Sequence, residues 1–285
     1  MKSRRFLGSL VLVFSLMMGI VGICPVEAEA ASSYTLLTGE SIEVTVFGST
    51  VKSYSSSKKS VIKLKKTGSN KVKVTAKKAG KSKVVIRGKN GGKLSYNFTV
   101  KKPKFKWTLK SYAFDAGYDV YSFQIVNKSG IYISSMKAKY HLYDASGTEI
   151  ESSDLTLNKM PPGKSAIYVL KHYNSSGTPL GDNARLSSFY TARSFNEFKY
   201  KYTNVSGKIK VTKGESTITI KNKTKKSVEA VVNILYYDAS GNIIDGYNSS
   251  AFLTSKGVQT LNLILPRNMD HYTATVRAVS YKYVG

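Results

Sequence analysis

Hydrophobic and polar residues alternate in short runs along most of the chain after residue 40. Ile42, Val44 and Val46 alternate with polar residues, and the stretches at 71–76 and 94–100 repeat the pattern. Alternation with period two predicts β-strands that bury one face, and the glycine, serine and asparagine residues between the runs favour turns. Almost no stretch follows the helical period. The pattern therefore predicts an all-β protein.

A first domain boundary is expected at the basic tripeptide Lys101-Lys102-Pro103. Proline has no backbone N–H to donate to a sheet, so it interrupts strands and suits a linker. We therefore expect residues 33–102 to form one small β-sandwich.

The remainder of the chain contains an internal repeat. Residues 127–129 (Asn-Lys-Ser) recur as 222–224 (Asn-Lys-Thr). The sequence Asp-Ala-Ser-Gly begins at both Asp144 and Asp238, and Gly163 recurs as Gly257, each 94 residues later. A fixed spacing at separate places indicates a duplicated unit. We expect two further β-sandwiches, at 103–204 and 205–285, in which each Asp-Ala-Ser-Gly forms a tight hairpin turn.

The first copy carries about fourteen extra residues between Gly163 and the start of the second copy. The additional residues form an insertion near 172–186. Loops of this size in compact domains are often functional or mobile, so the insertion is a candidate binding loop.

The first thirty residues have the pattern of a secretory signal. Lys2, Arg4 and Arg5 precede an apolar run at 6–24, which is followed by small-residue cleavage sites around Ala28. We expect residues 1–30 to be a cleaved signal peptide and the mature protein to be secreted or extracellular. The alternative is an uncleaved membrane anchor formed by the same apolar run.

The charge of the chain is strongly positive and concentrated near its N-terminus. Lysine and arginine number 44 against 17 aspartate and glutamate residues, a formal net charge of +27. Residues 31–102 hold 17 of these basic residues against two acidic ones, Glu40 and Glu43, which is a net charge of +15. A polyanionic partner accounts for this imbalance, and the alternative is a solvated face that protects sheet edges and keeps the protein soluble.

Period two also predicts where these lysines point. If residues 62–76 form a hairpin with Leu64, Val72 and Val74 inward, the lysines on either side of them leave from one outer face. The candidate polyanion-binding residues are Lys58, Lys59, Lys63, Lys65, Lys71, Lys73, Lys77, Lys78, Lys81 and Lys83.

The expected partner is an anionic cell-wall polymer such as wall teichoic acid, an anionic membrane surface or a host glycan. The mature chain has 36 lysines and only five arginines. Arginine is the residue that reads phosphate and guanine with two parallel hydrogen bonds, so sequence-specific recognition of nucleic acid is not expected. The sequence does not indicate an oligomeric state.

Two further interpretations remain open. The chain has 20 tyrosines and 11 phenylalanines, most of which we expect in the sandwich cores. Exposed aromatic rings stack on sugars, and Trp107 and Tyr112 near the first linker are the candidate carbohydrate-binding residues of an adhesin. The other interpretation is a structural spacer that an uncleaved N-terminal helix anchors to the membrane.

The sequence contains no pattern typical of catalysis or metal binding. The Gly-x-Ser-x-Gly turn of serine hydrolases is absent, and the single cysteine, Cys24, excludes thiolate metal centres. His141, His172 and His271 lack partners at the spacing of metal ligands. Sequence alone leaves two catalytic arrangements open: a triad assembled from distant residues, for example around Asp270 and His271, and a pair of carboxylates for glycoside cleavage. We expect a nonenzymatic protein without cofactor or metal.

Three short motifs occur in order within residues 33–101: Thr38-Gly39-Glu40-Ser41, Tyr54-Ser55-Ser56-Ser57 followed by Ser60-Val61, and Lys78-Ala79-Gly80 before Val84-Val85-Ile86. On these residues the segment resembles the group 2 bacterial immunoglobulin-like domains, which usually have tryptophan at the position of Tyr54. The two repeats resemble a small extracellular family named for a Phe-x-Leu-Tyr-Asp motif, which matches Tyr140 to Asp144 more closely than Ile234 to Asp238. These resemblances imply three tandem immunoglobulin-like β-sandwiches, typical of noncatalytic surface proteins of Gram-positive bacteria, and carry over no catalytic residue.

Cleavage of the signal predicts the mass of the mature protein. The N-terminus should lie at Glu29 or Ala31, and the mature chain should contain no thiol because Cys24 leaves with the signal. Intact-mass spectrometry of the protein from its producing cell checks this. A mass that includes residues 1–30 would support the membrane anchor instead.

Overall fold

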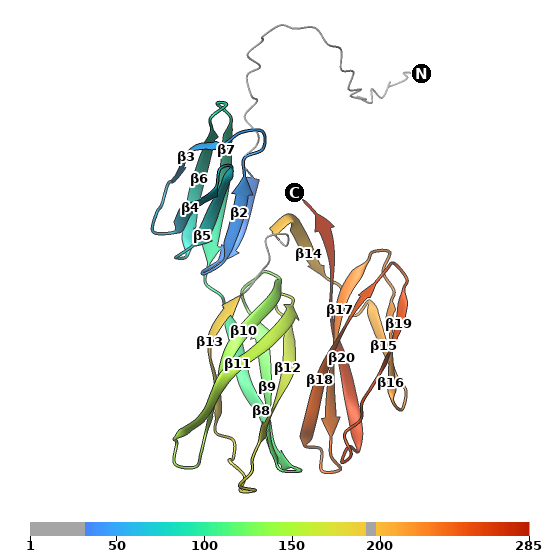
Figure 1. Cartoon of the computed structure of the whole chain (residues 1–285). Helices are drawn as coiled ribbons and strands as arrows, with labels where there is room; N and C mark the ends of the chain where they lie inside the picture. Colours follow the sequence, from blue (N-terminus) through green and yellow to red (C-terminus); the bar gives the residue numbers. More distant parts are fainter. Residues whose placement is uncertain (1–31, 192–197, 285) are drawn as a thin grey trace, which may run out of the picture.

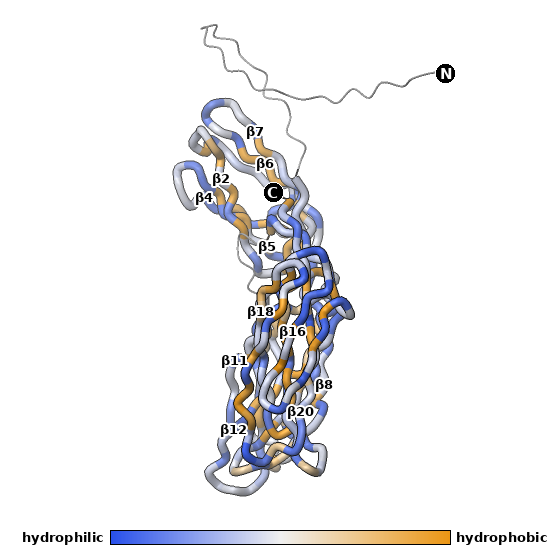
Figure 2. The backbone as a smooth tube through the Cα atoms, turned by 90° about the vertical axis from the view of Figure 1, so that its right-hand side faces the viewer, coloured by the Kyte–Doolittle hydropathy of each residue, from blue (hydrophilic) through white to orange (hydrophobic). Residues whose placement is uncertain are grey.

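Strands β1 to β20 form six sheets, which face one another in three pairs along the chain (Figure 1). The computed structural model describes residues 32–191 and 198–284; the expected signal peptide at 1–30 lies outside them. Hydrophobic and hydrophilic positions alternate along the strands (Figure 2), and each pair of sheets encloses one cluster of buried apolar residues. The predicted all-β fold of tandem β-sandwiches is confirmed.

The first unit is a sandwich of a four-stranded and a three-stranded sheet, ordered β1-β7-β6-β3 and β2-β5-β4. Its strands are β1 (Ser32–Leu37), β2 (Ser41–Thr45), β3 (Val51–Ser56), β4 (Ile62–Gly68), β5 (Lys71–Ala76), β6 (Gly80–Gly88) and β7 (Lys93–Lys101). β1 pairs with β7 in parallel, and the other pairs are antiparallel.

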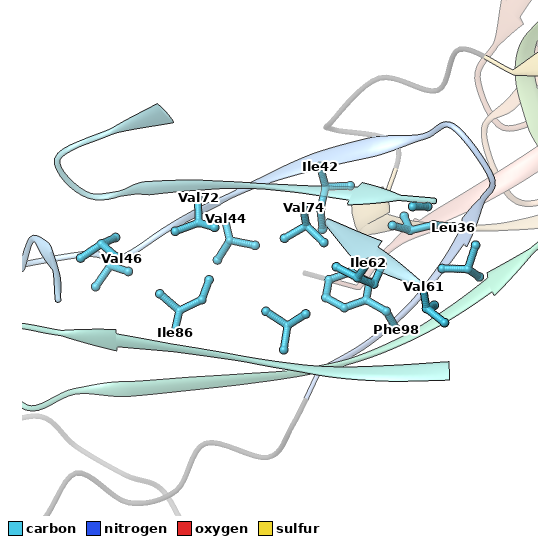
Figure 3. Close-up of a cluster of buried hydrophobic side chains, with 14 residues drawn as sticks. Leu36, Ile42, Val44, Val46, Val61, Ile62, Val72, Val74, Ile86 and Phe98 are labelled. Atoms are coloured by element: carbon cyan, nitrogen blue, oxygen red, sulfur yellow. The ribbon is translucent and has the colours of Figure 1, made fainter. Parts of the chain in front are cut away.

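The core of this unit consists of the alternate residues that period two selects (Figure 3). Val72 and Val74 of β5 are fully buried, as are Val84 and Ile86 of the opposite sheet. Burying one such side chain contributes about 1.5–3 kcal/mol, so the valines of β5 hold the two sheets together.

The second unit comprises β8 (Phe105–Asp115), β9 (Tyr118–Asn127), β10 (Ile133–Tyr143), β11 (Glu149–Met160), β12 (Ser165–Tyr173) and β13 (Ala184–Thr191). The third comprises β14 (Tyr200–Asn204), β15 (Ile209–Lys213), β16 (Thr217–Asn222), β17 (Val228–Tyr237), β18 (Ile243–Leu253), β19 (Val258–Asn262) and β20 (His271–Tyr283). The sheets β11-β10-β13 and β12-β9-β8 of the second unit correspond to β18-β17-β20 and β19-β16-β15 of the third. The repeat in the sequence is therefore a repeat of topology.

The recurring motifs have the same structural roles in both copies. Buried Asn127 donates to the carbonyls of Ile131 and Met160, and Asn222 makes the equivalent bonds to Lys226 and Thr254, all at 2.7 or 2.8 Å. In each hairpin the aspartate of Asp-Ala-Ser-Gly accepts backbone N–H groups two and four residues later. The predicted tight turns are confirmed.

One predicted boundary needs correction. Residue 204 was expected to end the second unit, but β14 pairs with β20 over Tyr200 to Asn204 and so extends a sheet of the third unit. This pairing is non-local, and the repeat does not reveal it because none of the strands described in the second unit corresponds to β14.

The second and third units lie side by side (Figure 1), with β18 against the sheet of β8, β9 and β12. Gly246 of β18 lies so close to Val169 of β12 that a Cβ at this position would be 2.4 Å from the valine Cγ2. Lys171 pairs with Asp245 across the contact at 3.1 Å, and buried Arg277 donates to the carbonyl of Asn158 at 3.3 Å. The two repeated units therefore pack through sheet faces.

The first unit contacts both of the others through a few residues. Leu37 is fully buried in the core of the second unit, and Phe198, two residues before β14 of the third unit, packs against the core of the first. Glu40, also buried, accepts the Thr191 hydroxyl at 3.0 Å. These contacts hold the end of the first sandwich that lies nearest residues 101–103 against the rest of the protein.

Because β18 and β12 approach closely, we expect that residue 246 cannot carry a side chain without loss of stability. Gly246→Ala should lower the free energy of unfolding by about 1–3 kcal/mol, because the new methyl group overpacks the contact with Val169. In a Val169→Ala background the same substitution should cost less, since the nearest methyl group is gone. Urea unfolding of the four chains in this double-mutant cycle measures the coupling. Equal costs in both backgrounds would contradict the packing described.

Candidate polyanion-binding surface

The predicted hairpin of β4 and β5 forms, and four of its lysines share the outer face of the sheet β2-β5-β4. Lys65 lies directly opposite Lys73, and Lys63 lies opposite Thr75. Lys63, Lys65, Lys71 and Lys73 are exposed, whereas Val72 and Val74 between them are fully buried and Leu64 is half-buried against the core. We call these four residues the lysine face.

One acidic group lies on the lysine face. Glu43 of β2 accepts the Thr67 hydroxyl at 2.7 Å and lies 3.4 Å from the Lys71 ammonium. The Thr67 hydrogen bond, together with Lys71 and Lys73, holds the pKa of Glu43 below its ordinary value. Glu43 therefore stays charged. It pairs with Lys71 and also attracts Lys73, which lies opposite it in the β2–β5 ladder, while the described residues show no ion pair for Lys63, Lys65 or Lys73.

The other acidic residue of this unit does not reach the surface. Glu40 is only 4% exposed, and its carboxylate accepts the backbone N–H of Leu37 at 2.6 Å in addition to the Thr191 hydroxyl. Because Glu40 is buried, half-buried Glu43 is the one carboxylate between residues 32 and 102 that reaches the surface. The surface of this unit is therefore even more positive than its composition indicates.

Four more of the predicted lysines gather at one end of the lysine face. Lys58 and Lys59 lie in the β3–β4 connection, and Lys77 and Lys78 lie in the β5–β6 connection. The Lys77 N–H donates to the Val61 carbonyl at 2.8 Å, which holds the two connections together. All four side chains are exposed and extend the positive surface around the end of the sandwich.

Lys81 and Lys83 lie elsewhere. They belong to β6, in the sheet β1-β7-β6-β3, and alternate with Ser82 and Val84, which face the core. Their side chains therefore leave from the opposite outer face of the sandwich. We predicted Lys81 and Lys83 as polyanion-binding residues because they are close in sequence to the lysine face. In the structure they lie on the other sheet of the sandwich.

Trp107 and Tyr112, the predicted carbohydrate-binding residues, both pack on the second core. Trp107 is half-buried and meets Phe123 edge to face at 6.1 Å. The Tyr112 hydroxyl donates to Asp119 at 2.5 Å, and burial together with this carboxylate raises the pKa of Tyr112 to about 12. Their placement does not favour the open platform expected of them.

The insertion in the second unit is an ordered loop between β12 and β13. Asp119, completely buried, accepts the side-chain amide of Asn174 at 2.7 Å and the backbone N–H of Leu180 at 3.0 Å. Asn174 in turn accepts the N–H and hydroxyl of Ser176. These bonds account for the loop's shape without a ligand.

The structure brings one histidine between a carboxylate and a hydroxyl. His141 of β10 is 2.7 Å from Glu149 through Nδ1 and 2.8 Å from Ser187 through Nε2. These distances match a catalytic triad, but acyl transfer also requires oriented donors for the developing oxyanion, so the three residues do not define an active site. Asp270 and His271 contact each other at 2.9 Å in an exposed position.

The described part of the chain offers no group of three or more histidine, cysteine, aspartate or glutamate side chains placed to hold a metal ion. Within residues 32–191 and 198–284, no helix has the length and apolar character needed to cross a membrane.

The sequence did not single out the groove between β3 and β4. Tyr54, Ile62, Leu64, Lys59, Lys63 and Lys77 line it, with Ser55 and Ser56, and its volume is about 420 Å³. Tyr54 was notable only as a replacement for tryptophan. Its position on a sheet edge depends on the pairing of distant strands, so the sequence carries no local signal for it.

Comparison with known proteins finds distant structural similarity only. No protein-family model matches the chain, and no curated protein has a similar sequence. A tetra-tandem repeat from the extending region of a large adhesion protein is 7% identical and covers 89% of this chain and 74% of its own, with a TM-score of 0.18. A Bacteroides ovatus surface protein of a mixed-linkage glucan utilization locus, in complex with a heptasaccharide, is 12% identical with the same coverage and TM-score. These scores are too low to establish a shared arrangement, so function has to be inferred from this chain's own surfaces.

The opposition of Lys65 and Lys73 predicts that the lysine face lowers stability. Like charges opposite each other in a sheet repel, so Lys65→Gln should raise the free energy of unfolding by about 0.2–1 kcal/mol at low salt. Lys63→Gln is the matched control because Lys63 faces Thr75, and its effect should be smaller. The difference should shrink near 1 M salt, where screening is nearly complete. Equal effects of both substitutions would show that the pair does not repel measurably.

Proposed function

We propose that this protein is a noncatalytic binding module of the cell surface or cell envelope, and that its N-terminal sandwich binds anionic polymers such as wall teichoic acid. The observation that carries the proposal is the lysine face: Lys63, Lys65 and Lys73 are exposed on one sheet, and the described residues provide them with no ion pair. The proposal includes secretion of the protein, directed by the N-terminal signal at residues 1–30.

Solubility alone explains the lysine face poorly. A soluble surface intersperses charges of both signs, which avoids repulsion between neighbours. Residues 31–102 contain 17 basic residues and only two acidic ones, of which Glu40 is buried. Lys65 of β4 also lies opposite Lys73 of β5, and two like charges in this position repel each other. An anionic polymer along this face would relieve the repulsion, because each phosphate or carboxylate neutralises an ammonium group.

The type of base indicates a diffuse mode of binding. Lysine ammonium groups act as point charges on flexible stems, whereas arginine matches phosphate with a fixed pair of donors. Arg87 is the only arginine of the first unit. We therefore expect binding that depends on charge density and salt, with no choice of nucleotide sequence.

A second candidate function is carbohydrate adhesion through aromatic rings of the third unit. Tyr200 lies opposite Tyr283 in the β14–β20 pair, and Tyr200 also contacts Tyr281, with ring centroids 5.2 to 5.5 Å apart in both contacts. Phe252 on β18 contacts Tyr281, and the rings of Phe252 and Tyr283 are about half exposed. This outer sheet face, rather than Trp107 and Tyr112, is where the structure gathers open aromatic rings.

Removing the lysine face should weaken binding and flatten its salt dependence. We expect the variant Lys63→Gln, Lys65→Gln, Lys71→Gln, Lys73→Gln to elute from immobilised wall teichoic acid at lower salt than the parent. Each lost contact with a flexible single-stranded polyanion should reduce the logarithmic salt slope by roughly 0.7. The fold should survive, because these side chains point to solvent.

The matched control removes four exposed lysines from the third unit: Lys208→Gln, Lys210→Gln, Lys221→Gln and Lys223→Gln. It has the same net charge as the first variant and should bind like the parent. Equal loss in both variants would mean that total charge, and not the lysine face, drives binding. Binding that persists unchanged near 1 M salt, where the Debye length is about 3 Å, would contradict an electrostatic mechanism altogether.

A further inference from the structure

The groove between β3 and β4 lies beside the lysine face and combines an aromatic ring with ammonium groups. β3 and β4 end their respective sheets, so one side of the sandwich is bounded by two strands that do not pair with each other. Lys66 spans the gap by donating to the Val51 carbonyl at 3.4 Å, and the β3–β4 connection closes the other end. The gap between these points is the groove of about 420 Å³.

Tyr54 is placed in this groove by its position on an edge strand. It lies opposite Ile86, so it points to the core side of its sheet. Core-facing rings are normally covered, but none of the described strands pairs with the outer edge of β3, and Tyr54 remains 39% exposed. The apolar side chains of Ile62 and Leu64 from β4 line the same groove. The groove therefore offers a ring face and an apolar floor to a ligand.

The other lining groups are cationic and polar. Lys59, Lys63 and Lys77 come from the β3–β4 connection, β4 and the β5–β6 connection, and their exposed side chains converge on one groove. Ser55 and Ser56 of β3 also line it, and the Ser56 hydroxyl already bonds Ser82 at 2.8 Å. The volume falls within the ~300–1,000 Å³ that sites for small ligands occupy.

We propose that this groove binds one acidic sugar unit of an anionic glycan, with the pyranose ring against Tyr54 and the acidic group between Lys59, Lys63 and Lys77. The inference rests on the proposed polyanion binding and narrows it to polymers that carry both a sugar ring and a negative charge. The C–H groups of a sugar ring pack on an aromatic face, and an ammonium group pairs with a carboxylate, sulfate or phosphate. In this proposal the lysine face attracts the anionic polymer, and the groove recognises one acidic sugar of it.

The test compares two probes that differ in the sugar ring. One is an oligogalacturonate, a chain of pyranose rings with one carboxylate each, and the other is a polyphosphate with the same number of charges. The mature chain should bind the oligogalacturonate more tightly. Tyr54→Ala should weaken oligogalacturonate binding about tenfold, in line with the loss of one aromatic stacking contact, and leave polyphosphate binding within about twofold.

Two control variants separate stacking from folding and from general exposure. Tyr54→Phe keeps the ring and should bind both probes like the parent. Phe47→Ala removes another exposed aromatic ring of the same unit, 87% exposed and outside the groove, and should leave both affinities unchanged.

The outcomes distinguish this inference from the proposed function. An equal fall for both probes in Tyr54→Ala, or equal affinity of the parent for both probes, would overturn the sugar site and leave polyanion binding intact. If the parent binds neither probe at low salt, the proposed function fails as well. Loss confined to the oligogalacturonate in Tyr54→Ala, with Tyr54→Phe unaffected, supports the groove as the site.

Discussion

The pairing register of β4 with β5 is the constraint on which the charged surface depends. Val72 and Val74 are fully buried, so the alternating residues of β5, Lys71 and Lys73, have to face solvent. A slip of one residue would bury both lysines and expose both valines. Desolvating an unpaired ammonium group costs several kcal/mol, whereas burying the valines is favourable. The energy that assembles the core therefore also fixes the direction of the lysines.

The contacts between units strengthen this arrangement. Glu40 is buried with the Thr191 hydroxyl and the Leu37 N–H, which removes one of the two carboxylates of the first unit from the surface. The repeated units pack against each other through β18 and β12, where Gly246 allows the sheets to approach. In the proposed function, the second and third units hold the first unit in place, and the exposed faces of the first unit bind the anionic polymer. The groove at Tyr54 is part of the same unit.

Sequence reasoning succeeded where structure is set locally. Period two placed Val72 and Val74 inside and their neighbouring lysines outside, and the chemistry of Asp-Ala-Ser-Gly predicted both hairpin turns. It was less informative wherever a residue's role depends on which sheet its strand joins. Lys83 does not lie with the other predicted lysines, because β6 belongs to the other sheet. Tyr112 points to buried Asp119 and not to solvent. The pairing of β14 with β20 and the gap at Tyr54 also arise from strands far apart in sequence.

The location of the bound polymer tests the central claim most directly. Amine-reactive labelling of the mature protein, read by mass spectrometry with and without purified wall teichoic acid, reports the accessibility of each lysine. The account predicts that the polymer protects Lys63, Lys65 and Lys73 several-fold at low salt, while Lys210 and Lys221 of the third unit, which are also exposed, keep their reactivity. Uniform protection of all lysines, or protection confined to the third unit, would contradict binding by the N-terminal sandwich.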